Sequence, residues 1–245
     1  VTFFCFISGV NFTLLYASVA KLKFKNLMKN AEFRFYLFSV FASTAVVMIA
    51  LMFKNGYGLE HAFRNSLFEV VTALTTTGFA NDNAGNWAHI TWVVIIVCMF
   101  LGANSGSTSG GFKSIRSVMI IKIIKNEFRQ MLHPNAIVPL KLNSINVPMQ
   151  KRVTLLAFLA SYLLILAISI FLMSLAGVES VDCVSISFSA LGNVGPAFGS
   201  YIGPNDSWAI LPDSCKWISS ILMLIGRLEI FSVLIIFTPA YWREN

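Results

Sequence analysis

The stretch that decides the fold is Ala73-Leu74-Thr75-Thr76-Thr77-Gly78-Phe79, which ends a segment of mixed polarity, residues 60–74. That segment is too short to cross a lipid bilayer. A second short segment, residues 181–191, ends in the same way at Ala190-Leu191-Gly192-Asn193-Val194-Gly195-Pro196. Further matches in the same order indicate an internal repeat, a common feature of membrane transport proteins.

The composition places the chain in lipid. Of its 245 residues, 56% are hydrophobic and 12% are charged, whereas a soluble domain has about 25% charged residues. Residues 33–53 and 153–175 each provide the roughly 20 apolar residues that a helix needs to cross a bilayer. Residues 1–20 are expected to end another span, and residues 217–240 to form the last one. A large soluble core is the alternative, and the scarcity of charge argues against it.

Basic residues gather in two stretches of the chain. These stretches contain Lys21, Lys23, Lys25, Lys29 and Arg34, and then Lys113, Arg116, Lys122, Lys125, Arg129, Lys141, Lys151 and Arg152. Because Lys and Arg stay on the cytoplasmic side of membrane spans, both stretches are predicted to be cytoplasmic. Long apolar segments separate them, so nucleic-acid binding, which needs one continuous basic face, is not expected.

The loops after the two short segments, residues 75–79 and 192–196, are candidate functional sites. Non-helical backbone at membrane depth is tolerated only where protein buries it or where it lines water. Glycine allows successive carbonyl groups to point toward one axis, and rings of carbonyls replace the hydration shell of a permeating cation. Neither loop carries a charge, which suits this role. An ordinary turn between two helices is the alternative for either loop alone.

A third unusual segment interrupts an apolar helix. Residues 90–101 are strongly apolar but end at a Gly- and Ser-rich run, residues 102–111. We therefore predict a helix that breaks at membrane depth and resumes near Lys113. The run is close to a phosphate-binding P-loop, but Phe112 separates its last glycine from the lysine that would reach the phosphates. This departure disfavours nucleotide binding.

The order span, short helix, loop and span, with Thr76-Thr77-Gly78-Phe79 in one loop and Gly192-Asn193-Val194-Gly195 in the other, resembles the TrkH/KtrB potassium transporters and their plant relatives. The resemblance covers essentially the whole chain. It implies an all-α membrane protein with tandem span–pore helix–filter loop–span repeats, as in potassium channels. Four such repeats surround one pore in that family.

By this analogy the chain holds the third and fourth repeats. Residues 1–32 would end the preceding repeat and form a cytoplasmic link, and residues 33–130 would form the third repeat with its broken second span. Residues 131–152 would be a cytoplasmic connection, and residues 153–245 the fourth repeat. The chain starts at Val1, within an apolar stretch, so we expect a longer protein that begins upstream. Two repeats supply half a fourfold filter, so this chain alone is not expected to conduct unless two copies pair.

The resemblance also implies which residues handle the ion. The backbone carbonyls of a filter that binds K⁺ would come from Thr76, Thr77, Gly78, Asn193, Val194 and Gly195. A gating loop below the filter would contain Gly102, Asn104, Ser105, Gly106, Ser107, Thr108, Gly110 and Gly111. No cofactor is implied besides the transported K⁺.

Arg227 matches an arginine that faces this loop in the family, where its positive charge raises a barrier to cations. An arginine that reaches to the membrane interface is the alternative. Glu229 lies two positions further on, so the two side chains point to different faces of a helix and are not expected to pair.

The implied activity is translocation of potassium, or another monovalent cation, by a multi-pass subunit in the lipid bilayer of the bacterial cytoplasmic (inner) membrane. Family members work as homodimers with a cytosolic nucleotide-binding regulatory ring, and both partners are expected here. Selectivity for potassium over sodium and coupling to sodium or protons stay open.

Two other classes of function are less consistent with the sequence. A secondary transporter coupled to sodium or protons would also have broken helices, but it predicts an inverted repeat and a buried carboxylate near the break. The repeat here is parallel, and the Gly/Ser run contains no acid. A metal-dependent membrane enzyme needs clustered histidines, and the three histidines lie in separate connections.

The cysteines and tryptophans bear on two further structural features. Cys183 and Cys215 both fall in segments predicted to face outward, so a disulfide between them stays open. Four tryptophans are predicted to anchor the outer ends of spans at the membrane interface. They are Trp87, Trp92, Trp208 and Trp217.

Overall fold

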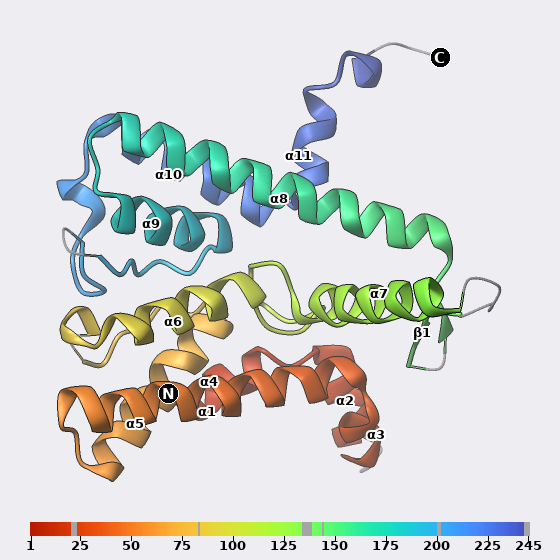
Figure 1. The fold of residues 1–245 in the computed structure, drawn as a ribbon, viewed down its shortest axis with the longest axis horizontal. Coiled ribbons are helices and arrows are strands. Elements are labelled where there is room, and N and C mark those ends of the chain that lie inside the picture. Colours follow the sequence, from red (N-terminus) through yellow and green to blue (C-terminus); the bar gives the residue numbers. More distant parts are fainter. Residues whose placement is uncertain (21–23, 83, 134–138, 144, 200–201, 243–245) are drawn as a thin grey trace.

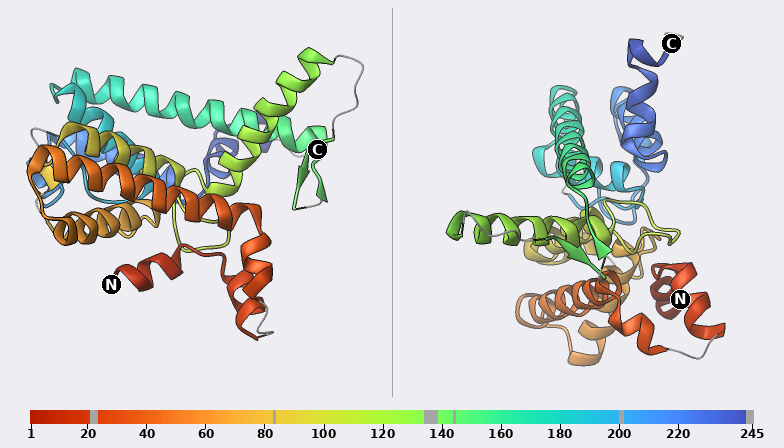
Figure 2. Two further views of the ribbon diagram at one scale, coloured as in Figure 1. Left: turned by 60° about the horizontal axis from the view of Figure 1, so that its bottom comes forward. Right: turned by 90° about the vertical axis from the view of Figure 1, so that its right-hand side faces the viewer.

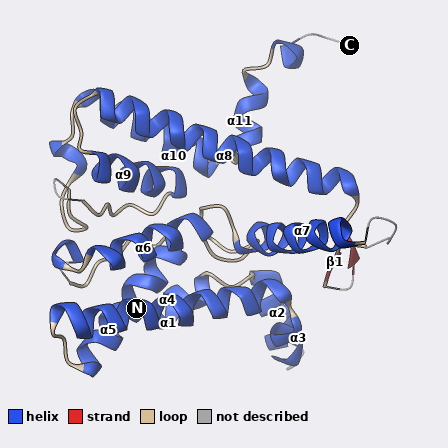
Figure 3. Cartoon of the chain, viewed as in Figure 1, coloured by secondary structure: helices blue, strands red, loops and turns tan. Residues whose placement is uncertain are grey.

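The fold is seen in a computed structural model, which describes residues 1–245 except 21–23, 83, 134–138, 144, 200–201 and 243–245 (Figure 1). The α-helices are α1 (Thr2–Ser8), α2 (Phe12–Ala20), α3 (Phe24–Lys29), α4 (Ala31–Asn55), α5 (Leu59–Leu74), α6 (His89–Leu101), α7 (Ser114–Leu132), α8 (Met149–Leu175), α9 (Ser180–Gly192), α10 (Asp213–Arg227) and α11 (Ile230–Ile236). The 3-10 helices are η1 (Ala84–Asn86), η2 (Trp208–Ile210) and η3 (Pro239–Trp242). Strands β1 (Lys141–Leu142) and β2 (Ile145–Asn146) form an antiparallel hairpin, with Lys141 opposite Asn146 (Figure 3). The predicted all-α class is confirmed.

The helices form two copies of one arrangement that lie against each other (Figure 1). In the first copy α4 packs against α5 and α6, and in the second α9 packs against α8 and α10. Helix α6 of the first copy also packs against α9 of the second. Each copy has its own apolar core, the first containing Tyr36 and Leu74 and the second containing Phe158 and Ile186. The predicted tandem repeat is therefore present in the fold.

Helices α4 and α8 are long and apolar enough to cross a membrane, as the sequence predicted. Helix α4 begins where the Asn30 side chain accepts hydrogen bonds from the backbone N–H groups of Glu32 and Phe33. It ends where Gly56 adopts the left-handed conformation, with φ of 69°. Both features satisfy backbone groups that a helix end leaves without partners. The short helices α5 and α9 follow these two spans, as predicted for pore helices.

The first and last predicted spans are wrong as continuous helices. Residues 1–20 form α1 and α2, which meet at an angle of 102°, and α10 meets α11 at 109°. Each pair could count as one broken span, which would give up to four spans among the described residues. The second bend occurs because Glu229 has φ of 63°, which ends the helical path after α10. Helix α11 consequently turns away from the rest of the molecule (Figure 2).

The tryptophans only partly follow the prediction of interface anchors. Trp217 is 73% exposed, but Trp87 and Trp92 are buried. The indole Nε1 of Trp92 donates a hydrogen bond to the carbonyl of Ala84 at 2.9 Å. Because η1 folds back over the first copy, these two rings join its apolar core instead of a membrane interface.

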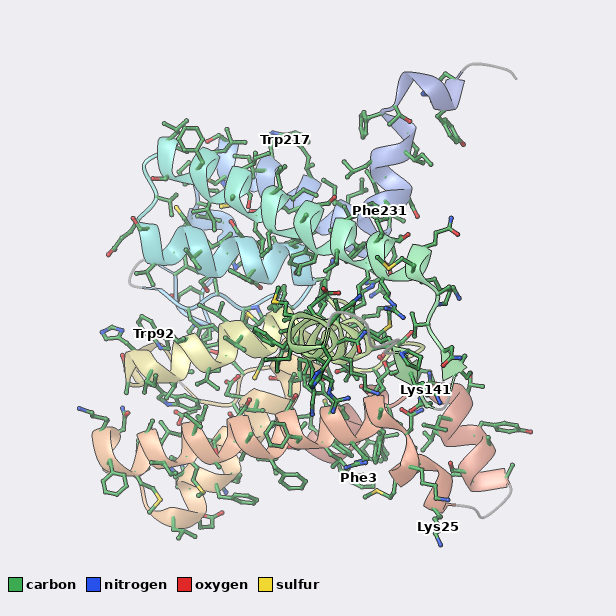
Figure 4. All side chains as sticks on the ribbon, turned by 45° about the vertical axis from the view of Figure 1, so that its right-hand side comes forward. Phe3, Lys25, Trp92, Lys141, Trp217 and Phe231 are labelled. Atoms are coloured by element: carbon green, nitrogen blue, oxygen red, sulfur yellow. The ribbon has the colours of Figure 1, made fainter. Side chains whose placement is uncertain are left out.

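Most residues of the two basic stretches lie toward one end of the molecule, the basic end, whereas Lys54 and Arg64 lie toward the other end. Lys25 and Lys141 lie at the basic end, and Trp92 lies at the opposite one (Figure 4). The basic end contains α2, α3, the later turns of α7 and the β-hairpin, while residues 56–58 before α5 and 176–179 before α9 lie at the other end (Figure 1). This distribution fits the positive-inside rule, with the basic end cytoplasmic. Lys21 and Lys23 lie outside the described residues.

The packing between α9 and α10 generates a prediction. A Cβ atom added to Gly226 of α10 would overlap the carbonyl oxygen of Leu191, so Gly226→Ala forces these backbones apart. We expect the full-length protein to lose about 1–3 kcal/mol of stability and to melt at a lower temperature in detergent. The control is Gly58→Ala, because Gly58 has open space around its Cβ position and a φ of −63°. Equal melting temperatures for both variants would contradict this account of the packing.

Candidate functional site

The two predicted filter loops lie in contact with each other. A Cβ atom on Gly78 would overlap the carbonyl oxygen of Val194, so the backbones approach more closely than any other residue would permit. Gly110 and Gly226 stand in the same relation to the carbonyl oxygens of Gly192 and Leu191. Three glycines from separate elements therefore surround the end of α9 and the loop that follows it. Loops far apart in the sequence meet in one place.

The backbone of the first loop adopts an unusual conformation. Thr76 has φ of 52° and Gly78 has φ of 75°. A β-branched residue with positive φ is rare, and such strain persists only where the surroundings impose it. The hydroxyl of Thr76 accepts a hydrogen bond from the backbone N–H of Gly110 at 2.8 Å. In addition, the N–H of Thr77 donates to the carbonyl of Thr72 at 2.9 Å, which holds the loop against the end of α5.

The second loop is held in a related way. Asn193 is left-handed, with φ of 56°, and its Nδ2 donates to the carbonyl of Met223 at 3.1 Å. The N–H of Gly195 donates to the hydroxyl of Ser189 at 3.0 Å. Gly195 itself has φ of 113°, and no atom lies within 4 Å of the place where its Cβ would stand. The loop is therefore fixed on one side and open on the other.

Residues 102–113 form a non-helical loop between α6 and α7, where the sequence predicted a broken helix. The two ends of the loop are joined, because the N–H of Phe112 donates to the carbonyl of Phe100 at 3.1 Å. The N–H of Ser114 likewise donates to the carbonyl of Ala103 at 2.9 Å. Glycine is required at Gly102, whose φ is 62° and whose Cβ would lie 2.8 Å from the carbonyl oxygen of Gly110. The broken span is thus a closed loop that folds back toward both filter loops.

The opposite side of this loop rests on the junction of α1 and α2. The N–H of Asn104 donates to the carbonyl of Gly9 at 3.1 Å, and the Asn11 side chain donates to the carbonyl of Ser105 at 2.5 Å. The buried carboxylate of Glu32, in the first turn of α4, accepts a hydrogen bond from the N–H of Ser105. Sequence reasoning missed Asn11 and Glu32. The sequence offered one weak signal for each: Asn11 is a polar residue inside an apolar stretch, and Glu32 is an acidic residue inside a basic stretch.

Arg227 and Glu229, at the bend between α10 and α11, contact different partners and not each other. The carboxylate of Glu229 lies 2.6 Å from Nη2 of Arg116 and 3.6 Å from Nζ of Lys113. Arg227 instead donates from Nη1 to the carbonyl of Thr108 at 3.4 Å. Arg116 also lies over the ring of Phe158, 4.0 Å from its centroid. Arg227 therefore reaches the Gly/Ser loop directly, while Glu229 binds the start of α7.

A polar cavity of about 230 Å³ lies between the Gly/Ser loop and the bend after α10. Its lining residues are Ser107, Thr108, Ser109, Gly110, Gly111, Lys113, Gly226, Arg227 and Glu229. The structure thus brings most of the predicted gating loop together with the predicted barrier arginine. Gly102 and Asn104 are buried behind it.

Three other candidate features are a metal site, a disulfide and a P-loop. The described residues contain no group of three or more His, Cys, Asp or Glu side chains that could hold a metal ion. The thiols of Cys183 and Cys215 are free and buried. The P-loop interpretation of residues 106–113 fails, because the loop follows helix α6 instead of a strand and Lys113 is paired with Glu229.

Comparison with known proteins gives the family. The family described as TrkH, cation transport protein, matches residues 1–244. The chain belongs to this family. In the TrkH family, the Trk system potassium uptake protein TrkH of Halomonas elongata is 31% identical over 98% of this chain and 49% of its own length. The protein of the same name from Escherichia coli K12 is 30% identical over 100% of this chain and 50% of its own length.

A solved structure agrees with the TrkH assignment. The crystal structure of the potassium transporter TrkH from Vibrio parahaemolyticus has a TM-score of 0.91 and 29% sequence identity, covering 99% of this chain and 52% of that one. This chain spans about half the length of the relatives it matches. It is thus a multi-pass inner-membrane protein whose relatives are cation transport proteins.

Proposed function

We propose that the chain forms half of a path for monovalent cations, principally potassium, through the bacterial inner membrane. The contact between Gly78 and Val194 carries the proposal, because it joins two neutral glycine loops at the ends of two pore helices. Relatives named as potassium uptake proteins support potassium as the ion. Since the chain spans about half of those relatives, the rest of a longer protein would complete the path.

In this proposal the selectivity filter uses backbone carbonyls. Its residues are Thr76, Thr77, Gly78, Asn193, Val194 and Gly195. Carbonyl oxygens replace the water around a K⁺ ion without the strong binding that a carboxylate would impose. The hydroxyl of Ser189 accepts a hydrogen bond from the N–H of Gly195, and the N–H of Gly110 donates to the hydroxyl of Thr76, so each loop is held by a neighbouring segment.

The gate of the proposed path is the Gly/Ser loop. The N–H of Gly110 contacts the hydroxyl of Thr76, so the loop touches the filter on one side and Arg227 on the other. A fixed positive charge 4 Å from a cation costs between about 1 and 4 kcal/mol as the effective dielectric constant falls from ~80 to ~20. Conduction would require the loop and Arg227 to move aside. A homodimer and a cytosolic nucleotide-binding ring are proposed partners, the latter at the basic end.

A secondary transporter coupled to sodium or protons is the second candidate, and one observation favours it. The buried carboxylate of Glu32 contacts Ser105 within the broken helix, although the Gly/Ser run itself contains no acid. Buried carboxylates near broken helices mark ion-coupling sites in such transporters. The parallel order of the repeats favours the pore.

A substitution at Gly195 tests the filter. Gly195→Asp would place a carboxylate in the open space beside the filter carbonyls, so we expect loss of potassium-limited growth in bacteria that lack their own uptake systems and carry the full-length gene. The control is Gly58→Asp, which puts the same side chain at the start of α5, away from both loops. Rescue by Gly195→Asp at equal expression would rule out the filter assignment.

The barrier is tested at Arg227. Arg227→Gln removes the charge beside the Gly/Ser loop, and we expect potassium flux into proteoliposomes of the full-length protein to rise about 5-fold or more. The control is Lys54→Gln, which removes a positive charge at the C-terminal end of α4 and should leave the flux unchanged. An unchanged or reduced flux at equal protein content would contradict the barrier role.

Glu32 separates the pore from the coupled transporter. In a pore the carboxylate serves as a hydrogen-bond acceptor for backbone N–H groups such as that of Ser105, and the amide oxygen of Glu32→Gln can still accept this bond. We therefore expect potassium uptake by Glu32→Gln to persist within a few-fold of wild type. Complete loss of uptake driven by a sodium or proton gradient, in a variant that remains folded, would favour the coupled transporter instead.

A further inference from the structure

A groove of about 470 Å³ lies between α4 and α7 at the basic end of the molecule. Its lining residues are Ala31, Arg34, Phe35, Phe38, Val118, Ile121 and Lys122. The two helices thus contribute basic and aromatic or aliphatic side chains to one surface. This surface takes no part in the ion path proposed above.

The basic residues of the groove have no acidic partner in the part of the chain that the structure describes. Among the described residues, neither Arg34 nor Lys122 forms an ion pair. Lys122 donates a hydrogen bond to the carbonyl of Lys141 at 2.8 Å. The nearby acid Glu32 is buried and bonded to Ser105, and Glu127 lies nine positions after Val118, on the opposite side of α7.

A second pocket extends the positive charge. It has a volume of about 220 Å³ and shares Lys122 with the groove. Its other lining residues are Lys125, Asn126, Arg129, Pro139, Leu140 and Lys141. A ligand with a negative head group would therefore find several cations within reach at this one end.

The order of side chains along both helices matches the shape of a phospholipid. On α4, Phe38 lies one turn further from the basic end than Arg34, and it is 69% exposed. On α7, Val118 lies one turn further from the basic end than Lys122. Arg34 and Lys122 thus lie nearer the cytoplasmic surface than Phe38 and Val118, and Phe35 and Ile121 line the groove beside the charges, so that apolar side chains continue from the head-group level to the depth of acyl chains.

We propose that this groove binds an anionic phospholipid of the cytoplasmic leaflet, with its phosphate on Arg34 and Lys122 and an acyl chain against Phe35, Phe38 and Ile121. Basic pockets between membrane helices on the cytoplasmic side are suited to such head groups. An acidic protein segment would use the cations but would leave the phenylalanines against lipid. The phospholipid accounts for both halves of the groove.

The test compares lipids retained by the full-length protein. The protein is purified in mixed micelles that contain equal amounts of phosphatidylglycerol and phosphatidylcholine, and bound lipids are counted by native mass spectrometry. We expect wild type to retain phosphatidylglycerol in preference to phosphatidylcholine. Arg34→Gln/Lys122→Gln should bind phosphatidylglycerol about 10-fold or more weakly, because two head-group cations are lost.

The matched control is Lys54→Gln/Arg64→Gln, which removes two basic side chains near the other end of α4 and on α5 and should leave retention unchanged. Phe38→Ser probes the apolar half without changing charge, and it should also reduce retention. Equal retention of both lipids by wild type would overturn the proposal. This is the result expected if another part of the protein or a second copy covers the groove. Unchanged retention by the Arg34→Gln/Lys122→Gln variant would overturn it as well.

Discussion

Direct contact between backbones of the two repeats is the constraint on which the rest of the structure depends. The carbonyl groups at the end of α9 are approached so closely by Gly78, Gly110 and Gly226 that none of these three could carry a side chain without movement. This packing brings two loops, a broken helix and the bend after α10 to one point. Every feature of the candidate site follows from that convergence.

Backbone at membrane depth must find hydrogen-bond partners within the protein. The Gly/Ser loop finds them on three sides: its own ends, the hydroxyl of Thr76 and the junction of α1 and α2. The loop is therefore held by many single contacts instead of by a packed helix. Such a segment can exchange its partners one at a time, which suits the gate that we propose for it.

The two charged residues around the bend after α10 have different partners. Glu229 is satisfied by Arg116 and Lys113, so the bend after α10 is fastened to the start of α7. Arg227 donates a hydrogen bond to the neutral carbonyl of Thr108 and lines the polar cavity. The barrier to cations that we propose depends on this arrangement, because pairing with Glu229 would cancel the charge of Arg227.

The fold class, the two full spans, the two short helices and the Gly/Ser break could all be predicted from the amino-acid sequence. Each depends on local properties, namely apolar length, charge and glycine content. Tertiary structure decided the bends at Gly9 and Glu229, the burial of Trp87 and Trp92, and the contacts of Glu32 with the loop. These depend on which segments meet in space, and no local pattern encodes a contact between residues as distant as Glu32 and Ser105.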